Sequence, residues 1–207
     1  MNQKNSLGLN SCFLDLDDPI ELFKLWMDDA KKSEPNDPNA VSLATSNNNF
    51  PSVRMVLLKD FSQNGFVFYT NLNSQKGNEL KENPKAAMCF HWKSLLRQIR
   101  INGSVTKVSD EDADQYFNSR AYESRIGAWA SKQSEVISNR EVLLNSIKEY
   151  QIKFNDKNKV PRPSHWTGWN LSPLSFEFWL DVDNRLHERL KYTKDRNGCW
   201  IKSLLSP

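Results

Sequence analysis

Residues 97–108 read RQIRINGSVTKV, and this stretch decides the class of the fold. Ile99 and Ile101 alternate with polar side chains. Successive side chains of a strand point to opposite faces, so the apolar residues would share one face and the polar residues the other. Such alternation is typical of an antiparallel strand that covers a core with one face and meets water with the other. The stretch therefore predicts a long strand in an antiparallel sheet.

Further strands are expected on both sides of this segment. Short β-branched and aromatic runs, separated by Asn, Gly, Ser and Pro, indicate them. They cover residues 40–46, 52–61, 65–71 and 85–92 before it and residues 174–180, 185–193 and 199–205 after it. Turn residues at 63–65 and 195–198 are typical of hairpins, and residues 160–169, VPRPSHWTGW, are expected to form a loop.

Helices are predicted at four places between or before these strands. Apolar residues recur at helical spacing in residues 20–32 and 138–154, and shorter helices are expected at 74–83 and 110–120. Strands thus come first, helices follow, and strands end the chain. This order predicts a mostly β fold with peripheral α-helices, built as an antiparallel barrel.

Composition favours one domain. The chain has 207 residues, of which 38% are hydrophobic, so it can bury a sizeable core. We expect residues 1–17 to form a flexible N-terminal segment and residues 18–207 to form a single domain. The net charge is only +3, which argues against a nucleic-acid-binding protein because such proteins concentrate a larger basic excess.

Several other classes of protein are disfavoured by what the sequence lacks. The three cysteines are far apart, which indicates reduced thiols in the cytoplasm. No apolar run approaches the length of a membrane helix, and no G-x-G phosphate loop occurs. The three histidines do not stand at metal-ligand spacing, so no metal site is expected. If the protein is an enzyme, a cofactor is expected to carry the difficult step.

Cationic side chains inside apolar strands are the first candidate binding residues. Arg54 and Lys59 bracket an apolar run and are five positions apart, so a regular strand would turn them to opposite faces. Either a bulge intervenes or the two residues serve different partners. Two solvated strand ends remain an equal alternative.

A second candidate group lies in the predicted helix at 110–120 and just beyond it. Tyr116, Arg120 and Ser124 are spaced by four, so they share one side if the helix runs that far. Two hydroxyls and a guanidinium on one side suit a phosphate group. An ordinary exposed helix face explains the same spacing.

The third candidate group belongs to residues 176–190, FEFWLDVDNRLHERL. Arg185, His187 and Arg189 stand at alternate positions, which a strand would turn to one face, with Leu186 and Leu190 on the other. Three cationic or chargeable groups so close repel one another, so the pattern calls for an anionic or acceptor-rich partner among them.

The sequence resembles the pyridoxine/pyridoxamine 5′-phosphate oxidases, a family of FMN-dependent enzymes of vitamin B6 metabolism. The resemblance runs from about Asp18 to the C-terminus and rests on separate blocks in the family order. These blocks are RMVLLK (54–59), FYTN (68–71), RQIRINGSV (97–105), YFNSR (116–120), IGAWASKQS (126–134), FEFW (176–179) and RLHER (185–189).

The resemblance implies a fold, a reaction and an assembly. The fold would be the antiparallel FMN-binding split β-barrel, with a C-terminal dimerisation region and FMN at the interface of a homodimer. The reaction would oxidise pyridoxamine or pyridoxine 5′-phosphate to pyridoxal 5′-phosphate and reduce O2 to hydrogen peroxide.

The resemblance also implies roles for individual residues. Arg185 and His187 match the catalytic pair over the substrate ring. The substrate-binding set would be Lys59, Tyr116, Arg120, Ser124, Arg185, Leu186 and His187. The FMN-binding set would be Arg54, Met55, Val56, Leu57, Leu58, Lys59, Tyr69, Thr70, Gln75, Lys76, Gln98, Gln133, Ser134, Trp179 and Arg189.

The chain departs from the family pattern at a few positions. Gln75 stands where the family commonly has an Arg, so a charge-assisted contact to the FMN phosphate would become neutral. Leu180, Thr167, Asn170 and Leu204 also replace the usual residues, and two of these changes remove a cation. We expect these changes to affect flavin affinity and dimer stability more than the type of reaction.

Two other classes of function stay open on the sequence. One is a split-barrel protein that binds a flavin or pyridoxal phosphate with weak or no oxidase turnover. The lost cations favour it, whereas the intact YFNSR and RLHER blocks argue against it. The other is a nucleic-acid-binding barrel with stacking aromatics, which the small net charge disfavours.

Overall fold

The computed structural model describes residues 6–207, with strands, helices and strands in the expected order. The helices are α1 (Pro19–Ser33), α2 (Gln75–Glu82), α3 (Asp110–Ser119), α4 (Tyr122–Ala130) and α5 (Arg140–Lys153), with short 3-10 turns at Lys93–Leu95 and Asp183–Arg185. The strands are β1 (Ala40–Asn47), β2 (Phe50–Leu57), β3 (Asp60–Ser62), β4 (Gly65–Asn71), β5 (Lys85–Trp92), β6 (Arg97–Lys107), β7 (Trp166–Leu180), β8 (Glu188–Lys194) and β9 (Trp200–Leu204).

The strands form one antiparallel sheet, with β6 at its centre. The strand order is β2-β1-β5-β6-β7-β4-β3, and β8 and β9 continue from the far half of β7. One edge of β7 pairs with β6, while the other edge pairs first with β4 and then with β8. The Lys59 N–H donates to the Val67 carbonyl at 2.8 Å, which joins the end of β2 to β4. The sheet is therefore a split barrel, as predicted.

Strand β6 shows the expected alternation. Ile99 and Ile101 are fully buried, while Arg100 and Asn102 face outward. The register with β7 shifts between Asn102 and Gly103, which marks a bulge. A Cβ at Gly103 would lie 2.2 Å from the Ser172 carbonyl oxygen, so only glycine allows β6 and β7 to approach so closely there.

Helix α1 packs its apolar side into the barrel. Asp18 caps its N-terminus and Pro19 occupies its first turn, so the helix starts where the sequence predicts. Phe23 is fully buried and meets Phe61 and Phe66 edge-on, with ring centroids 4.9 Å apart in both pairs. Aromatic contacts of this kind stabilise a core beyond their buried area.

Residues 6–17, which belong to the N-terminal segment expected to be flexible, make packing contacts with the domain. Phe13 is fully buried, and the Cys12 carbonyl accepts a hydrogen bond from the indole of Trp26 at 2.8 Å. The Leu16 carbonyl accepts one from the Tyr192 hydroxyl at 2.8 Å. Residues 1–5, which belong to the same expectation, lie outside the described residues.

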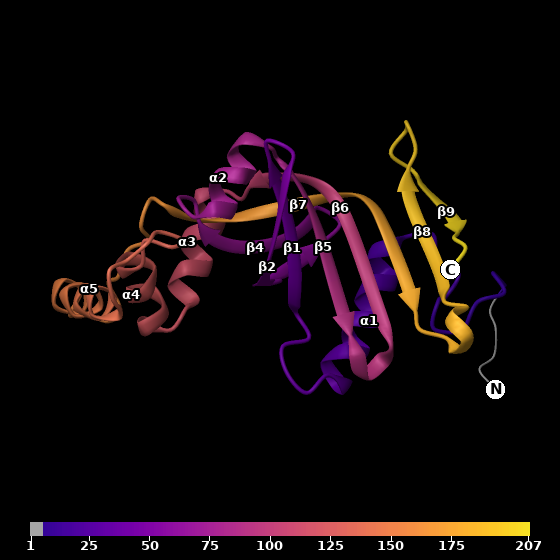
Figure 1. Ribbon diagram of the computed structural model, residues 1–207, viewed down its shortest axis with the longest axis horizontal. Helices are drawn as coiled ribbons and strands as arrows, with labels where there is room; N and C mark the ends of the chain where they lie inside the picture. The colour runs from indigo at the N-terminus through magenta and orange to yellow at the C-terminus, as the bar shows by residue number, and fades with distance from the viewer. Residues whose placement is uncertain (1–5) are drawn as a thin grey trace.

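The two ends of the molecule differ in secondary structure. Helices α3, α4 and α5 gather at one end, and β8 and β9 lie at the other (Figure 1).

The predicted loop at 160–169 is partly wrong, because Trp166 already begins β7. Within residues 6–207, no helix combines the length and the apolar character needed to cross a membrane.

Candidate functional site

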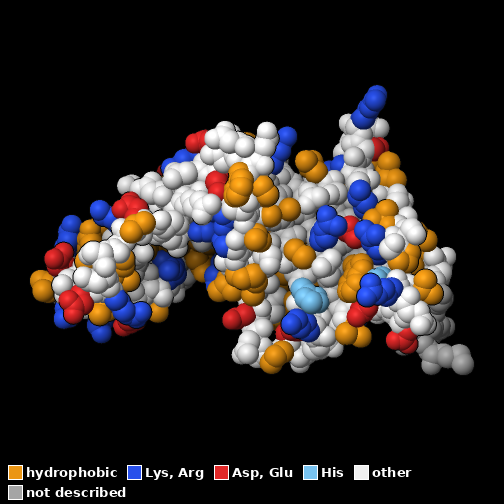
Figure 2. Space-filling view, viewed as in Figure 1, with side chains coloured by type: hydrophobic (Ala, Val, Ile, Leu, Met, Phe, Trp, Pro, Cys, Tyr) orange, Lys and Arg blue, Asp and Glu red, His pale blue; other side chains and the backbone are white. Residues whose placement is uncertain are grey.

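Most of the predicted site residues line one cavity of about 710 Å³. It lies between the β2–β4 side of the barrel and helices α3 and α4, and basic side chains lie near the hollow between the helical end and the sheet in Figure 2. The predicted residues in its wall are Arg54, Met55, Val56, Leu57, Lys59, Tyr69, Thr70, Lys76, Tyr116, Arg120, Ser124 and Gln133. The fold thus brings together residues from four of the sequence blocks that carry the resemblance, together with Lys76 and Ser124.

Tyr116, Arg120 and Ser124 reach this cavity by a different route from the one expected. The helix does not run through all three, because α3 ends at Ser119 and Arg120 has extended backbone angles before α4 begins at Tyr122. The break between the two helices still leaves all three side chains at the cavity wall.

Arg120 carries an unused hydrogen-bond donor at the cavity. Its guanidinium lies over the Trp166 ring at 4.8 Å. Its Nη1 is buried and has no hydrogen-bond partner among residues 6–207. Burial lowers the pKa of Arg120, yet a guanidinium remains charged in proteins. A charged donor held without an acceptor is suited to an anion.

Lys76 provides a second cation without an acidic partner. Its Nζ lies 3.0 Å from Gln133 Oε1 and 3.3 Å from Thr70 Oγ1, both neutral acceptors. No ion pair holds the Lys76 amine within the part of the chain that the structure describes. Burial lowers the pKa of Lys76, and the positive charge of Arg54 lowers it further. An anion bound there would stabilise the charged amine.

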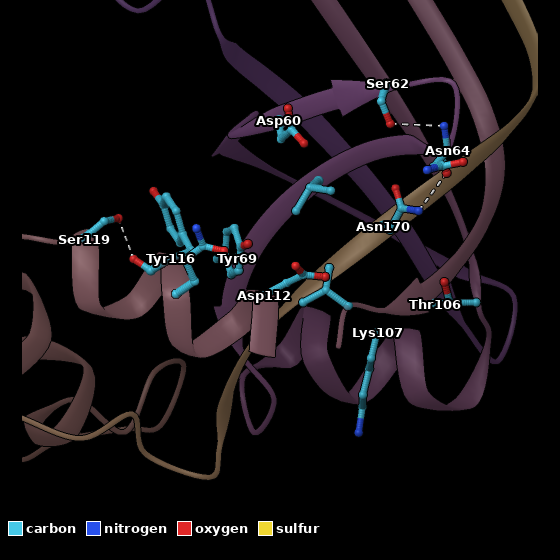
Figure 3. Close-up of a pocket in the computed structure, with 13 residues that line it drawn as sticks. Asp60, Ser62, Asn64, Tyr69, Thr106, Lys107, Asp112, Tyr116, Ser119 and Asn170 are labelled. Carbon is cyan, nitrogen blue, oxygen red and sulfur yellow. Dashed lines mark hydrogen bonds between the residues drawn. The ribbon is translucent and has the colours of Figure 1, made fainter. Parts of the chain in front are cut away.

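Stacked aromatic rings form one wall of the cavity. The rings of Tyr69, Tyr116 and Trp166 lie within 16° of parallel, and the Tyr69 centroid is 4.0 Å from that of Tyr116 and 5.1 Å from that of Trp166. Tyr69 and Tyr116 also line a second cavity of about 480 Å³, shown in Figure 3, whose wall includes Asp112. Burial and then the Asp112 carboxylate raise the pKa of Tyr69, so its phenol stays protonated.

A second group of predicted residues lies outside the 710 Å³ cavity. Gln98, Trp179 and Arg189 are register partners across β6, β7 and β8 and therefore form one row on the sheet. Glu177 holds Arg189 through two hydrogen bonds of 2.9 and 2.8 Å, from Nε and Nη2. Both bonds end on the same oxygen, Glu177 Oε1, while Glu177 Oε2 accepts a hydrogen bond from Arg100 Nη1 at 3.1 Å. Glu177 therefore holds both arginines on this face of the sheet.

Arg185, Leu186 and His187 are not in a strand, so the expected alternation is wrong for them. Arg185 ends a 3-10 turn with φ of 61°, and β8 begins only at Glu188. The expectation that Leu186 faces the core is also wrong, because its side chain is 66% exposed, whereas Leu190 is fully buried.

His187 is nevertheless well oriented. Its Nδ1 lies 2.9 Å from the Asp181 carboxylate, and its ring centroid lies 4.6 Å from that of Trp179. The Val182 N–H also lies 3.3 Å from Nδ1. The protein thus contacts Nδ1 through both Asp181 and Val182, which leaves Nε2 as the free position. Arg185 is exposed beside it.

Besides Gln98, Trp179 and Arg189, three more predicted FMN residues lie outside the cavity wall. Leu58 is a core residue; its backbone N–H donates to the Asn39 carbonyl, and its carbonyl accepts from the Asn39 side-chain amide. Gln75 donates to Glu79 at 2.9 Å, and Ser134 is exposed. Sequence reasoning also missed Glu79, although this acid follows Gln75 by four positions and therefore lies on the same helix face.

The fold and the cavity define a class of protein, a split barrel with a site for a planar, anionic ligand. The chain belongs to the pyridoxine/pyridoxamine 5′-phosphate oxidase family. The family model described as pyridoxamine 5′-phosphate oxidase matches residues 27–154. A second model, the pyridoxine 5′-phosphate oxidase C-terminal dimerisation region, matches residues 166–207.

Relatives and solved structures agree with this assignment. The chain is 74% identical to the pyridoxine/pyridoxamine 5′-phosphate oxidase of Pelagibacter ubique over 100% of both chains. It is 51% identical to that of Allorhizobium ampelinum, over 94% of this chain and 95% of the relative. Among structures, PhzG of Burkholderia lata, solved with tetrahydrophenazine-1-carboxylic acid, superposes with a TM-score of 0.89 at 28% identity, covering 99% of this chain and 100% of that one.

A more distant structure supports the fold alone. A pyridoxamine 5′-phosphate oxidase-related, FMN-binding protein of Nostoc punctiforme superposes with a TM-score of 0.72 at 15% identity, covering 92% of this chain and 98% of that one. The split barrel is thus shared with proteins whose sequences have diverged widely.

Proposed function

We propose that the protein oxidises pyridoxamine 5′-phosphate and pyridoxine 5′-phosphate to pyridoxal 5′-phosphate, with FMN as cofactor and O2 as electron acceptor. The observation that carries the proposal is the presence of two cations without acidic partners, Lys76 and Arg120, in one cavity with a stacked aromatic wall. FMN and the substrate each bring one phosphate and one planar ring, so the cavity offers what both molecules need.

The residues of the cavity divide between the two ligands. Lys76, Thr70 and Gln133 form one polar cluster that would hold the FMN phosphate. Arg120, with Tyr116, Ser124 and Lys59, would hold the substrate phosphate. The β2 residues Met55, Val56 and Leu57 line the same cavity, and the flavin ring would lie against them. Bound FMN supplies the capacity to accept two electrons from the substrate.

The protein's own contribution to the reaction is binding and orientation. Arg185 and His187 would hold the substrate ring, and His187 would exchange a proton at Nε2 because Asp181 occupies Nδ1. Overall the substrate loses two electrons and two protons, and O2 gains them as hydrogen peroxide. With the amine substrate, water then hydrolyses the resulting imine, so the products are the aldehyde and ammonia.

We infer that a second copy of the chain completes the site. Gln98, Trp179, Arg185, His187 and Arg189 lie outside the cavity, although they belong to the same implied site. Four of them fall within the region that matches the dimerisation model. In a homodimer, these residues of one protomer would meet the cavity of its partner, so each FMN would lie at the interface.

Val53→Asp is expected to shift the protein from dimer to monomer. Val53 is 69% exposed on β2, a strand that also exposes Phe50 and Met55, and hydrophobic side chains gather near the middle of the face in Figure 2. Exposed apolar patches mark interfaces, and a carboxylate there would lose its hydration on association. Light scattering after size exclusion measures the mass. Leu25→Asp on α1 is the control, and a dimeric Val53→Asp protein would exclude β2 from the interface.

FMN affinity is expected to fall with rising pH because of Lys76. An anion binds the protonated amine more tightly, and the pKa of Lys76 is lowered, so affinity declines as pH rises through that lowered pKa, below the ordinary 10.5. Quenching of flavin fluorescence against pH measures it. Riboflavin, which lacks the phosphate, should show no such decline, and Lys76→Arg should remove it. Equal pH profiles for FMN and riboflavin would contradict the assignment of Lys76.

A visible spectrum tests the proposed function. The purified protein should be yellow, bleach on adding pyridoxamine 5′-phosphate without oxygen, and recover with release of hydrogen peroxide on aeration. A yellow protein that does not bleach would instead be a flavin-binding protein without oxidase turnover. A colourless protein that does not take up FMN would exclude both functions.

We also propose that the protein works in the cytoplasm. Cys12, Cys89 and Cys199 are all free, as expected for a reducing compartment. No membrane or nucleic-acid partner is proposed. Activity recovered in the membrane pellet after cell fractionation would contradict this placement.

A further inference from the structure

A buried carboxylate lies behind the phosphate end of the cavity. Glu79, on α2, is only 7% exposed and accepts four hydrogen bonds. Its donors are the hydroxyls of Thr45 and Ser52 at 2.5 and 2.6 Å, the Gln75 amide at 2.9 Å and the Arg54 guanidinium at 3.0 Å. The carboxylate thus ties β1, β2 and α2 together at one point.

The same network holds Arg54 in a single position. Its Nη2 donates to Glu79 and, at 2.9 Å, to Ser52 Oγ, and its Nη1 donates to Thr45 Oγ1 and to the Leu43 carbonyl at 3.3 Å. These bonds use the four hydrogens on the two terminal nitrogens. The Nε–H remains without a partner among residues 6–207, and Arg54 lines the cavity.

Only an acceptor without hydrogens fits at the centre of this network. The four groups around Glu79 all donate to it, and the two hydroxyls in turn accept from Arg54. A carboxylate has two oxygens with four acceptor positions, whereas an amide would turn two hydrogens toward these donors. The positive charges of Arg54 and Lys76 also repel each other, and the negative charge of Glu79 offsets that repulsion.

We propose that Glu79 is a positioning residue for the flavin phosphate, which it serves by fixing Arg54 in the cavity wall beside Lys76. Glu79 does not line the cavity, so it acts through Arg54. Gln75, which stands where the family commonly has an Arg, is turned to Glu79 and leaves the phosphate to Arg54 and Lys76. This inference rests on the proposed function, because it takes FMN as the ligand.

Glu79→Gln is the test, made on the full-length protein. We expect its Kd for FMN to rise about tenfold, the effect of losing one hydrogen-bonded charge, while its Kd for riboflavin stays unchanged. Flavin fluorescence quenching measures both constants. Glu82→Gln removes the same charge from an exposed position on the same helix and should change neither. A Glu79→Gln protein with unchanged or tighter FMN binding would overturn the proposal, and equal losses for FMN and riboflavin would reduce Glu79 to a folding role.

A double-mutant cycle tests whether Glu79 acts through Arg54. Arg54→Ala should weaken FMN binding, and adding Glu79→Gln to it should cost little more, because the residue that Glu79 positions is already gone. Additive losses would overturn the proposal. If Glu79→Gln does not fold, Ser52→Ala removes one branch of the network and should raise the Kd for FMN about threefold. Failure of the unchanged protein to bind FMN would instead reject the proposed function.

Discussion

Arg120→Ala should raise the KM for pyridoxamine 5′-phosphate about 100-fold and leave kcat much less affected. The Arg120 guanidinium is held over Trp166 with a buried, unpaired Nη1, so it needs no rearrangement to meet a phosphate. A charge-assisted hydrogen bond contributes about 1.5–3 kcal/mol, and 2.7 kcal/mol corresponds to roughly 100-fold in binding. The loss should disappear for unphosphorylated pyridoxamine, which cannot use the contact. Steady-state kinetics on both substrates measure this difference.

The control for this variant is Arg140→Ala. Arg140 is exposed at the start of α5 and lies outside the cavity wall, so its loss should leave KM unchanged. A normal KM in Arg120→Ala would place the substrate phosphate elsewhere. A lost flavin would assign Arg120 to the cofactor instead.

His187→Ala should lower kcat/KM by roughly 100-fold or more while FMN stays bound. Positioned groups that exchange protons typically contribute 10²–10⁴-fold, and the contact of His187 with Asp181 holds its ring ready for this role. Arg185→Ala should have a similar effect, because the two residues are assigned to the same substrate ring. The flavin content of each variant, read from its visible spectrum, separates this result from a loss of cofactor.

Arg196→Ala is the matched control for Arg185→Ala. Arg196 is an exposed arginine in the turn between β8 and β9 and should not affect the kinetics. If His187→Ala or Arg185→Ala lost its flavin, the residue would belong to the cofactor site. If both variants kept full kcat/KM, the assignment of this pair to catalysis would be wrong.

The fold was largely predictable because the alternation of apolar and polar residues that marks a strand involves only neighbouring positions. The alternation in β6 and the turn at Gly65 can both be read from a few adjacent residues. The same reasoning failed at Arg185 and His187, because the 3-10 turn before β8 interrupts a pattern that looks regular in sequence. Alternation predicts the face to which a side chain points only where the strand is continuous.

The site was predictable in its members but not in their arrangement. The family resemblance named Lys76, Arg120 and Arg189, but no pattern in one chain shows that the first two line a cavity and the third lies outside it. Glu79 was missed because an acid on a short polar helix is usually solvated. Its burial depends on β1 and β2, which are distant in sequence.

Strand β7 sets the distance between two groups of predicted site residues. It carries Trp166, beside Arg120, and Trp179, beside His187, on one strand, whose register with β6 shifts at Leu174. At about 3.3 Å per residue, roughly 43 Å of strand separates them. A single inserted or deleted residue between them would shift one group of site residues against the other and reverse the faces. We therefore expect natural length variation to collect in the turns, such as the one between β8 and β9, and to spare this strand.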